Sequence, residues 1–407
     1  LGLDMRFCGP GPPIDIMKGV RNMQTPAIRF HRLAAGRAPA RLGMLVLCAA
    51  LAACAAPGVQ SGKPGPGAEA AQAPARQAVL RRDLAPGLYE LVVADGDVFV
   101  ASAGRSFKAD EGGAIYRLDP ATLETKAVIQ TERKPYGLAY DARTDTLYAG
   151  NTLNGSVQAI DLKAGKAANY RLGQAKAKGG FEHVRQIVLD EARDRMFVTN
   201  PDTAGKVWIV DLKRGALLHT LSGLRKWPAG AAYDPAANRL YVGQGGDYGV
   251  TVIDPDSGKI LRRFALDGAE PFLVNVALDD TGARLFGADA NSGRLVVLDT
   301  ATGRVLAAVP VGESALDVLY NPVRDEIYVS NRGASREHPM GTGAITVIDG
   351  TTYAVKARHD LPVHPNSLAL SADGQVLFAT IKGPHDDKHP AHRADGLESV
   401  VRIDLRG

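Results

Sequence analysis

The chain has 407 residues, with 48 Lys or Arg and 44 Asp or Glu, and its three cysteines are Cys8, Cys48 and Cys54. Seven of the basic and two of the acidic residues lie in the first 53 positions, which leaves 41 basic and 42 acidic residues after them. This balance excludes a broad basic face that follows duplex nucleic acid, so anion binding requires a local patch. The absence of cysteine after position 54 excludes a disulfide scaffold there.

The first 53 residues have the pattern of a secretion signal. An apolar run covers residues 42–53, which is too short for a membrane-spanning helix and has the length of the apolar part of a signal peptide. Because the chain begins with Leu1, we expect the true start at Met17 or Met23. Four arginines lie shortly before the run: Arg29, Arg32, Arg37 and Arg41.

The apolar run ends in Leu51-Ala52-Ala53-Cys54, which resembles the lipobox of bacterial lipoproteins. In such a motif the thiol of Cys54 carries the lipid; the alternative is a cleaved leader with a chance cysteine. Residues 54–76 are rich in Pro, Gly and Ala and predict a flexible tether behind the lipidated cysteine. Because Ala55 is not aspartate, we expect a periplasmic monomer sorted to the outer membrane, which touches the membrane only through its lipid anchor.

Seven short strand motifs recur along the rest of the chain. Each alternates large apolar residues, and a turn and a second strand ending in an aliphatic residue and an aspartate follow it. The separations of the closing aspartates run from 42 to 55 residues, a period typical of propeller blades. The motifs begin at Val98, Leu147, Met196, Leu240, Leu285, Ile327 and Leu377.

Each repeat reads as four short strands between polar turns. Such a sheet cannot bury both faces alone, whereas sheets stacked around an axis can. Residues 77–407 therefore predict an all-β fold, a seven-bladed β-propeller of four-stranded antiparallel blades. We expect the closing aspartates to cap turns and not to catalyse; they are Asp119, Asp161, Asp211, Asp254, Asp299, Asp349 and Asp404.

The seventh repeat lacks a fourth strand, because only three residues follow Asp404. Residues 77–82 form a strand-like run that belongs to no repeat. The sequence therefore predicts that this N-terminal strand completes the last blade and closes the ring.

The tetrads Phe-Val-Thr-Asn at 197–200 and Tyr-Val-Ser-Asn at 328–331, with Thr-Val-Ile-Asp at 346–349, resemble YVTN-repeat propellers of the bacterial YncE-like type. The resemblance implies a seven-bladed cell-envelope propeller in a superfamily of WD40/YVTN-repeat-like and quinoprotein amine dehydrogenase beta-chain-like proteins. Trp208 and Trp227 are the only tryptophans, so the tryptophan that marks each blade of quinone-cofactor dehydrogenases is absent.

Three loops are longer than the others and lie in blades one, six and seven, which are neighbours once the ring closes. They cover residues 103–113, 332–343 and 382–398. Long loops on a rigid scaffold are a usual place for binding, although solvated decoration is the alternative. The residues expected on this face are Arg332, Arg336, His338, His385, Asp386, His389 and His392. His385, His389 and His392 are weak candidates for a metal, since no helical or cysteine spacing supports them, and we expect no metal and no cofactor.

The second candidate site is the mouth of the central channel, lined by residues just before each innermost strand. One half is basic and aromatic and the other acidic, so the two halves either neutralise one another or form a slot for an anion with a planar group. The mouth candidates are Arg133, Lys134, Tyr136, His183, Arg185, Arg225, Lys226, Trp227, Glu270 and Phe272.

The sequence holds no nucleophile elbow, no HExxH pair and no phosphate-binding glycine loop. We therefore expect a non-enzymatic envelope binding protein or scaffold for an anionic small ligand, an envelope saccharide, single-stranded nucleic acid or an envelope protein. The alternatives are a sugar-lactone hydrolase that uses His183, Arg185 and Glu270, and a quinoprotein-like dehydrogenase.

Overall fold

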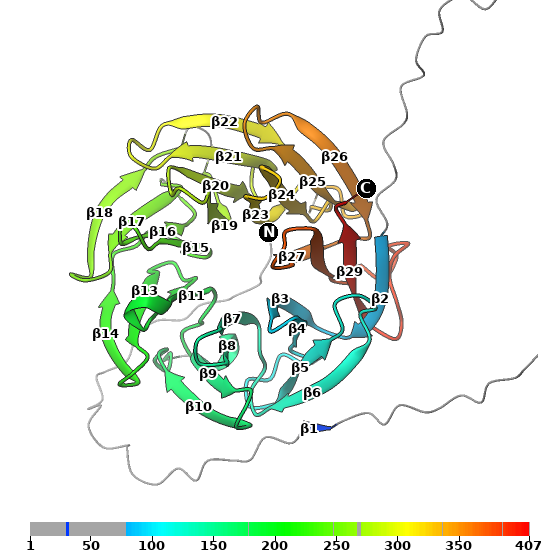
Figure 1. Ribbon diagram of the computed structural model, residues 1–407, viewed down its shortest axis with the longest axis horizontal. Helices are drawn as coiled ribbons and strands as arrows, with labels where there is room; N and C mark the ends of the chain where they lie inside the picture. Colours follow the sequence, from blue (N-terminus) through cyan, green and yellow to red (C-terminus); the bar gives the residue numbers. More distant parts are fainter. Residues whose placement is uncertain are drawn as a thin grey trace, which may run out of the picture.

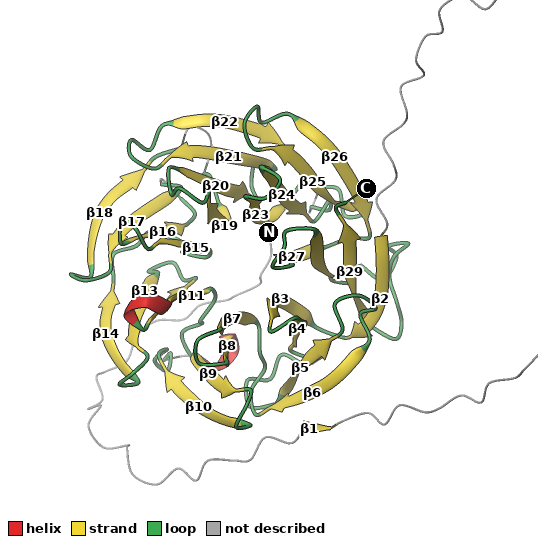
Figure 2. Cartoon of the chain, in the orientation of Figure 1, coloured by secondary structure: helices red, strands yellow, loops and turns green. Residues whose placement is uncertain are grey.

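Seven antiparallel sheets are arranged around one axis (Figure 1). The computed structural model describes residues 30–31, 79–177, 179–246, 248–266, 270–335, 337–384 and 386–406. Apart from two short 3-10 helices, Thr152–Asn154 and Glu191–Arg193, the elements of this part of the chain are strands (Figure 2). Over the same residues, no helix is long and apolar enough to cross a membrane. The predicted seven-bladed β-propeller is confirmed.

Within blades one to six, the strands follow the sequence from the channel outwards. Blade one contains β3 (Leu88–Ala94), β4 (Asp97–Ser102), β5 (Gly113–Leu118) and β6 (Thr125–Thr131). Blade two contains β7 (Gly137–Asp141), β8 (Thr146–Asn151), β9 (Ser156–Asp161) and β10 (Lys166–Arg171), and blade three β11 (Ile187–Asp190), β12 (Arg195–Asn200), β13 (Lys206–Asp211) and β14 (Ala216–Leu221). Blade four contains β15 (Ala231–Asp234), β16 (Arg239–Gly243), β17 (Val250–Asp254) and β18 (Lys259–Phe264), and blade five β19 (Leu273–Leu278), β20 (Arg284–Asp289), β21 (Arg294–Asp299) and β22 (Val305–Pro310). Blade six contains β23 (Ala315–Asn321), β24 (Glu326–Asn331), β25 (Gly343–Asp349) and β26 (Val355–Leu361).

The seventh blade is completed by the N-terminal strand. Its own strands are β27 (Pro365–Leu370), β28 (Val376–Ile381) and β29 (Glu398–Asp404), and β2 (Val79–Ala85) pairs antiparallel with β29. Val79 lies opposite Ile403 and Arg82 opposite Val400. The predicted closure is therefore confirmed, with the strand beginning at Val79. A two-residue strand, β1 (Phe30–His31), pairs with β6; the rest of the predicted leader, Cys54 and the tether lie outside the described residues.

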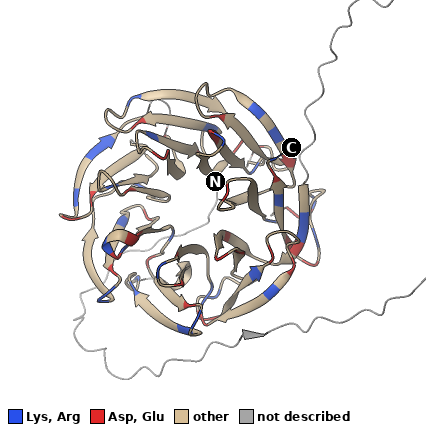
Figure 3. Ribbon diagram, viewed as in Figure 1, with Lys and Arg blue, Asp and Glu red and all other residues tan. Residues whose placement is uncertain are grey.

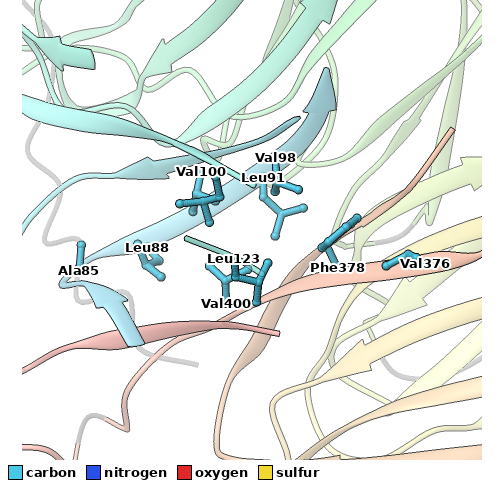
Figure 4. Close-up of a cluster of buried hydrophobic side chains, with 10 residues drawn as sticks. Ala85, Leu88, Leu91, Val98, Val100, Leu123, Val376, Phe378 and Val400 are labelled. Carbon is cyan, nitrogen blue, oxygen red and sulfur yellow. The ribbon is translucent and has the colours of Figure 1, made fainter. Parts of the chain in front are cut away.

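The core consists of buried apolar clusters between adjacent blades, and seven such clusters account for the seven interfaces. The cluster that closes the ring joins Val98 and Val100 of blade one to Phe378 and Val400 of blade seven (Figure 4). Large β-branched and aromatic side chains alternate along each second strand, so both faces of a blade are buried against its neighbours.

The hydroxyl of the YVTN-type tetrads links neighbouring blades. The Thr199 Oγ1 donates to the carbonyl of Ala229 at 2.5 Å, and the Ser330 Oγ donates to the carbonyl of Asn366 at 2.8 Å. The predicted turn caps are also present: the Asp119 Oδ1 accepts from the backbone N–H groups of Ala121 and Thr122, both at 2.9 Å. These short polar contacts fix the spacing of the inner strands and so position the channel mouth.

Candidate ligand-binding site at the channel mouth

Two tyrosines and a lysine from three blades meet at the face where the inner strands begin. Tyr89 lies in β3, Tyr136 directly precedes β7, and Lys382 directly follows β28. The ring centroids of Tyr89 and Tyr136 are 4.3 Å apart, with the planes tilted by 57°. The Lys382 Nζ lies 3.8 Å from the centroid of the Tyr89 ring and donates to the carbonyl of Leu88 at 2.7 Å. These contacts form a fixed aromatic and cationic corner between blades one, two and seven.

The charge of Lys382 is compensated within the corner. Its Nζ lies 3.5 Å from the Glu398 Oε2, and both side chains are largely buried. The Glu398 carboxylate also accepts from the backbone N–H groups of Leu88 and Gly383. Burial lowers the pKa of Lys382, and the charge of Glu398 opposes that effect. Lys382 and Glu398 therefore form a nearly neutral unit that anchors the blade-seven loop.

Arg332 directly follows β24 and brings a second cation to the same corner. Burial lowers the pKa of its guanidinium, and the neighbouring Tyr89 acts in the opposite direction. The Arg332 Nε is buried and has no hydrogen-bond partner among the described residues. Within that part of the chain, no carboxylate forms an ion pair with Arg332 either. A buried donor without an acceptor is costly, so this guanidinium is an unsatisfied group of the mouth.

Arg185, just before β11, reaches across blade two to Glu90 of β3 and forms an ion pair with it. The Glu90 Oε2 also accepts from the backbone N–H of Leu138 at 3.0 Å. Burial raises the pKa of Glu90, which the charge of Arg185 counteracts. Asp317 of β23 lies in the same channel wall, where burial raises its pKa to about 7.

We define the mouth cluster as Tyr89, Tyr136, Arg185, Arg332 and Lys382. Arg185 and Lys382 each have a carboxylate partner, whereas Arg332 has none among the described residues. The cluster therefore presents one uncompensated positive charge beside two aromatic rings. Such an arrangement is suited to an anionic group attached to a flat or ring-shaped body.

Two members of the predicted basic half lie outside this cluster. Lys134 is buried, with its Nζ 2.8 Å from the Ala103 carbonyl and 3.6 Å from Glu111. The Arg133 Nη1 donates to the carbonyl of Asp110 at 3.0 Å. Both side chains therefore hold the long loop of blade one.

The predicted residues of blade four lie at the rim of the mouth. The Lys226 Nζ is 3.8 Å from the Glu270 Oε1, and both side chains are exposed. The Arg225 guanidinium is 5.8 Å from the Tyr248 ring centroid. Trp227 is half-buried and has φ of +59°, a backbone conformation that is uncommon for any residue other than glycine. These residues form a polar rim of the mouth, and the contacts just described do not involve the mouth cluster.

The residues proposed for lactone hydrolysis have different partners. Arg185 pairs with Glu90 and Glu270 with Lys226, while burial lowers the pKa of half-buried His183. Among the described residues, no hydrogen bond or ion pair joins His183, Arg185 and Glu270. Phe272 is half-buried and donates its backbone N–H to Asp289 at 3.0 Å.

One histidine of the long loops, His389, is buried and links two loops. His389 is 3% exposed, and its Nε2 lies 3.1 Å from the Gly341 carbonyl. Its Nδ1 accepts from the backbone N–H of Ala391, so Nε2 carries the proton and donates. His389 thus joins the loops of blades six and seven.

The other loop candidates do not gather around one point. His338 pairs with Glu313, Asp386 accepts from the backbone N–H of Lys388 at 2.9 Å, and His392 is exposed. Arg336 and His385 lie outside the described residues. Over residues that the structure describes, no group of three or more His, Cys, Asp and Glu side chains is placed to hold a metal.

The sequence named most members of the mouth cluster but separated them into two sites. The sequence predicts Arg332 on the loop face and Tyr136 and Arg185 at the mouth, whereas the structure brings all three together around Tyr89. Their positions in the repeat could have placed them together. Arg332 and Lys382 each directly follow the second strand of a blade, and the end of that strand lies on the same face of the propeller as the start of the inner strands.

Comparison with known proteins agrees with the fold. YncE of Salmonella typhi is 36% identical over 339 residues, which cover 81% of this chain and 92% of that protein. YncE of Escherichia coli K12 is 36% identical over 338 residues with the same coverage. Antigen Lp49 of Leptospira interrogans is 23% identical over 245 residues, 57% of this chain and 48% of the antigen.

Among solved structures, a chain of Kuenenia stuttgartiensis hydrazine synthase superimposes with a TM-score of 0.52 at 20% identity, covering 61% of this chain and 74% of that one. At this identity the likeness concerns the fold alone. No family model matches the chain. The extent of the similarity to the two YncE proteins shows that the chain belongs to the YncE family.

Proposed function

We propose that this protein is a lipid-anchored binding protein of the cell envelope that holds an anionic ligand at its channel mouth without transforming it. The lipobox-like sequence around Cys54 supports the anchor and the periplasmic location. The observation that carries the binding proposal is Arg332, whose buried Nε–H has no acceptor among the described residues. A carboxylate or phosphate group would supply both the acceptor and the compensating charge.

The neighbours of Arg332 favour an anion that carries a ring. Half-buried Tyr89 offers part of an aromatic ring beside the guanidinium, backed by the buried ring of Tyr136, against which a base or a sugar ring can pack. Basic and acidic residues are interspersed around the ring in the view of Figure 3, so the long-range field does not favour duplex nucleic acid. Single-stranded nucleic acid and an anionic envelope saccharide are the two candidate ligands.

The test compares two arginine variants with the wild type. A labelled oligothymidylate is titrated by fluorescence anisotropy and an oligouronate by calorimetry. Arg332→Gln should weaken binding by about tenfold or more, because it removes a charge-assisted hydrogen bond in a buried setting. For the oligonucleotide, it should also reduce the slope of log affinity against log salt by about 0.7. Arg133→Gln is the matched control, since Arg133 binds the Asp110 carbonyl outside the mouth cluster.

The two probes distinguish the candidate ligands, and the variants test the site. If Arg332→Gln binds both probes as tightly as the wild type, the mouth cluster is not the binding site. If Arg133→Gln loses affinity and Arg332→Gln does not, binding belongs to the long loop of blade one. Turnover of a sugar lactone by the wild type, lost in His183→Asn, would favour the hydrolase alternative instead.

A further inference from the structure

Two arginines from neighbouring blades reach the same part of the face that carries the channel mouth, outside the mouth cluster. Arg133 lies two residues after the end of β6, and Arg171 is the last residue of β10. Strands β6 and β10 are the outermost propeller strands of blades one and two, so both end on the face where the inner strands begin (Figure 1). We call Arg133 and Arg171 the arginine pair.

The strand register directs Arg171 towards blade one. Side chains four positions apart on a strand share a face, so Arg171 lies on the same side of β10 as Ala167. Ala167 packs against the apolar cluster between blades one and two, which includes Ile129 of β6. Arg171 is therefore on the side of blade two that faces Arg133.

The two guanidinium groups also act on each other electrostatically. Burial lowers the pKa of Arg171, and the positive charge of Arg133 lowers it further. Charges at a protein surface influence one another only over about 10 Å at moderate salt. The fold thus holds two like charges close together, which is unfavourable unless an anion compensates them.

Each guanidinium is held in place by one backbone carbonyl. The Arg171 Nη1 donates to the carbonyl of Asn154 at 2.6 Å, and the Arg171 Cζ lies 4.3 Å from the centroid of the Phe181 ring. The Arg133 Nη1 donates to the carbonyl of Asp110 at 3.0 Å. Over the part of the chain that the structure describes, neither guanidinium has another hydrogen-bond acceptor or an ion pair with a carboxylate. Because a guanidinium has several N–H donors, most donors of the arginine pair remain available.

These donors can be reached from solvent. Arg171 is exposed and Arg133 is half-buried. The acidic side chains nearest to Arg133 in the sequence, Asp110 and Glu132, are exposed, and within the described residues neither forms an ion pair with it. The arginine pair is therefore both accessible and uncompensated.

Two uncompensated guanidinium groups match a doubly charged oxyanion. A carboxylate or a phosphodiester carries one negative charge and would compensate only one of them. A phosphomonoester carries nearly two negative charges at neutral pH and has three strong acceptor oxygens. Planar guanidinium groups bind such oxygens through pairs of N–H donors. The contact with Phe181 restrains Arg171 in advance, which reduces the side-chain entropy lost on binding.

We propose that the arginine pair binds a doubly charged tetrahedral oxyanion of the phosphomonoester class, at the outer edge of the face between blades one and two. The anion lies between the two guanidinium groups and accepts hydrogen bonds from both. This site is independent of the mouth cluster: oligouronates and oligothymidylates carry one charge on each group and do not require two arginines.

The test compares methyl phosphate with dimethyl phosphate by isothermal titration calorimetry at low salt. At pH 8 methyl phosphate is a dianion, because its second pKa is about 6, whereas dimethyl phosphate is a monoanion of similar shape. We expect saturable binding of methyl phosphate with a dissociation constant on the order of 1 mM. Dimethyl phosphate should bind at least about tenfold more weakly, since it leaves one guanidinium uncompensated.

The site variants are Arg171→Gln and Arg133→Gln, and Arg262→Gln is the matched control. Arg262 is exposed and donates to the carbonyl of Ala301, but it lies on β18 of blade four. Each site variant should weaken the binding of methyl phosphate by about tenfold or more, while the control should bind it like the wild type. Circular dichroism verifies that each variant is folded.

Two further ligands identify the source of the anion. Tighter binding of glucose 1-phosphate indicates a phosphorylated saccharide, and tighter binding of inorganic phosphate indicates the free ion. The proposal is overturned by equal affinity for methyl and dimethyl phosphate, by the absence of saturable binding to the wild type, or by site variants that bind as tightly as Arg262→Gln.

Discussion

The Nζ of Lys382 in blade seven lies 3.8 Å from the ring centroid of Tyr89 in blade one. The same lysine donates to the carbonyl of Leu88, so it links the last blade to the first at the channel mouth. The ring is closed at its outer edge by the pairing of β2 with β29. Tyr89 and Lys382 are a second, polar closure at the inner end of the same interface.

Replacing Tyr89 tests this inner closure. Tyr89→Leu removes both the cation–π contact and the contact with Tyr136, and should lower the free energy of unfolding by about 1–2 kcal/mol. Tyr89→Phe keeps the ring and should stay close to the wild type. Chemical denaturation monitored by circular dichroism measures the difference. Equal losses in the two variants would assign the effect to the hydroxyl group instead of the ring.

Deleting the latch strand Val79–Ala85 should destabilise the whole ring. The deletion exposes the edge of β29 and apolar side chains beneath it, including Phe378 and Val400. The melting temperature should fall by more than about 5 °C. Deletion of residues 55–76 is the control, since the predicted tether precedes the latch and should not affect melting. A latch deletion that melts like the control would show that β2 does not stabilise the ring.

The stability of the ring should depend on pH through Asp317. Burial raises its pKa from 3.8 to about 7, although the backbone N–H of Leu368 donates to it at 2.8 Å. The folded state therefore keeps a proton that the unfolded state releases above pH 4. The free energy of unfolding should fall as the pH rises from about 4 to about 7, and this contribution should be level above that range.

Asp317→Asn isolates this contribution, because asparagine does not titrate. The stability advantage of the wild type over the variant should shrink between pH 5 and pH 8, while the raised pKa of Glu90 affects both proteins in the same direction. Denaturant midpoints at four pH values provide the measurement. Parallel stability profiles for the two proteins would contradict the assigned role of Asp317.

Cys54→Ser should release the protein from membranes if the lipobox prediction is correct. The membrane affinity of a lipid anchor increases with the number of CH₂ groups that it buries in the bilayer. A variant without the acylated thiol should therefore move to the soluble periplasmic fraction. The circular dichroism and the melting temperature should stay unchanged, because the tether separates the anchor from the propeller. A serine variant that still fractionates with membranes would favour a chance cysteine at this position.

The repeat pattern determined the fold because it is a local property repeated seven times. Successive apolar residues such as Phe197 and Val198 point to opposite faces of a strand and pack in two different core clusters, so a sheet with two apolar faces must be covered on both sides. The same reasoning anticipated that the run near Val79 would complete the last blade. The YVTN-type tetrads carry the hydroxyl that links one blade to the next, which gives this sequence signature a structural cause.

The composition of the site was decided only by the tertiary structure. Lys134 and Arg332 are both basic residues near the mouth, yet Lys134 is satisfied by the carbonyl of Ala103, whereas the Arg332 Nε has no partner among the described residues. Strand periodicity is encoded within a few neighbouring residues, but the partner of a buried charge comes from another blade, so its satisfaction depends on how the blades are packed together.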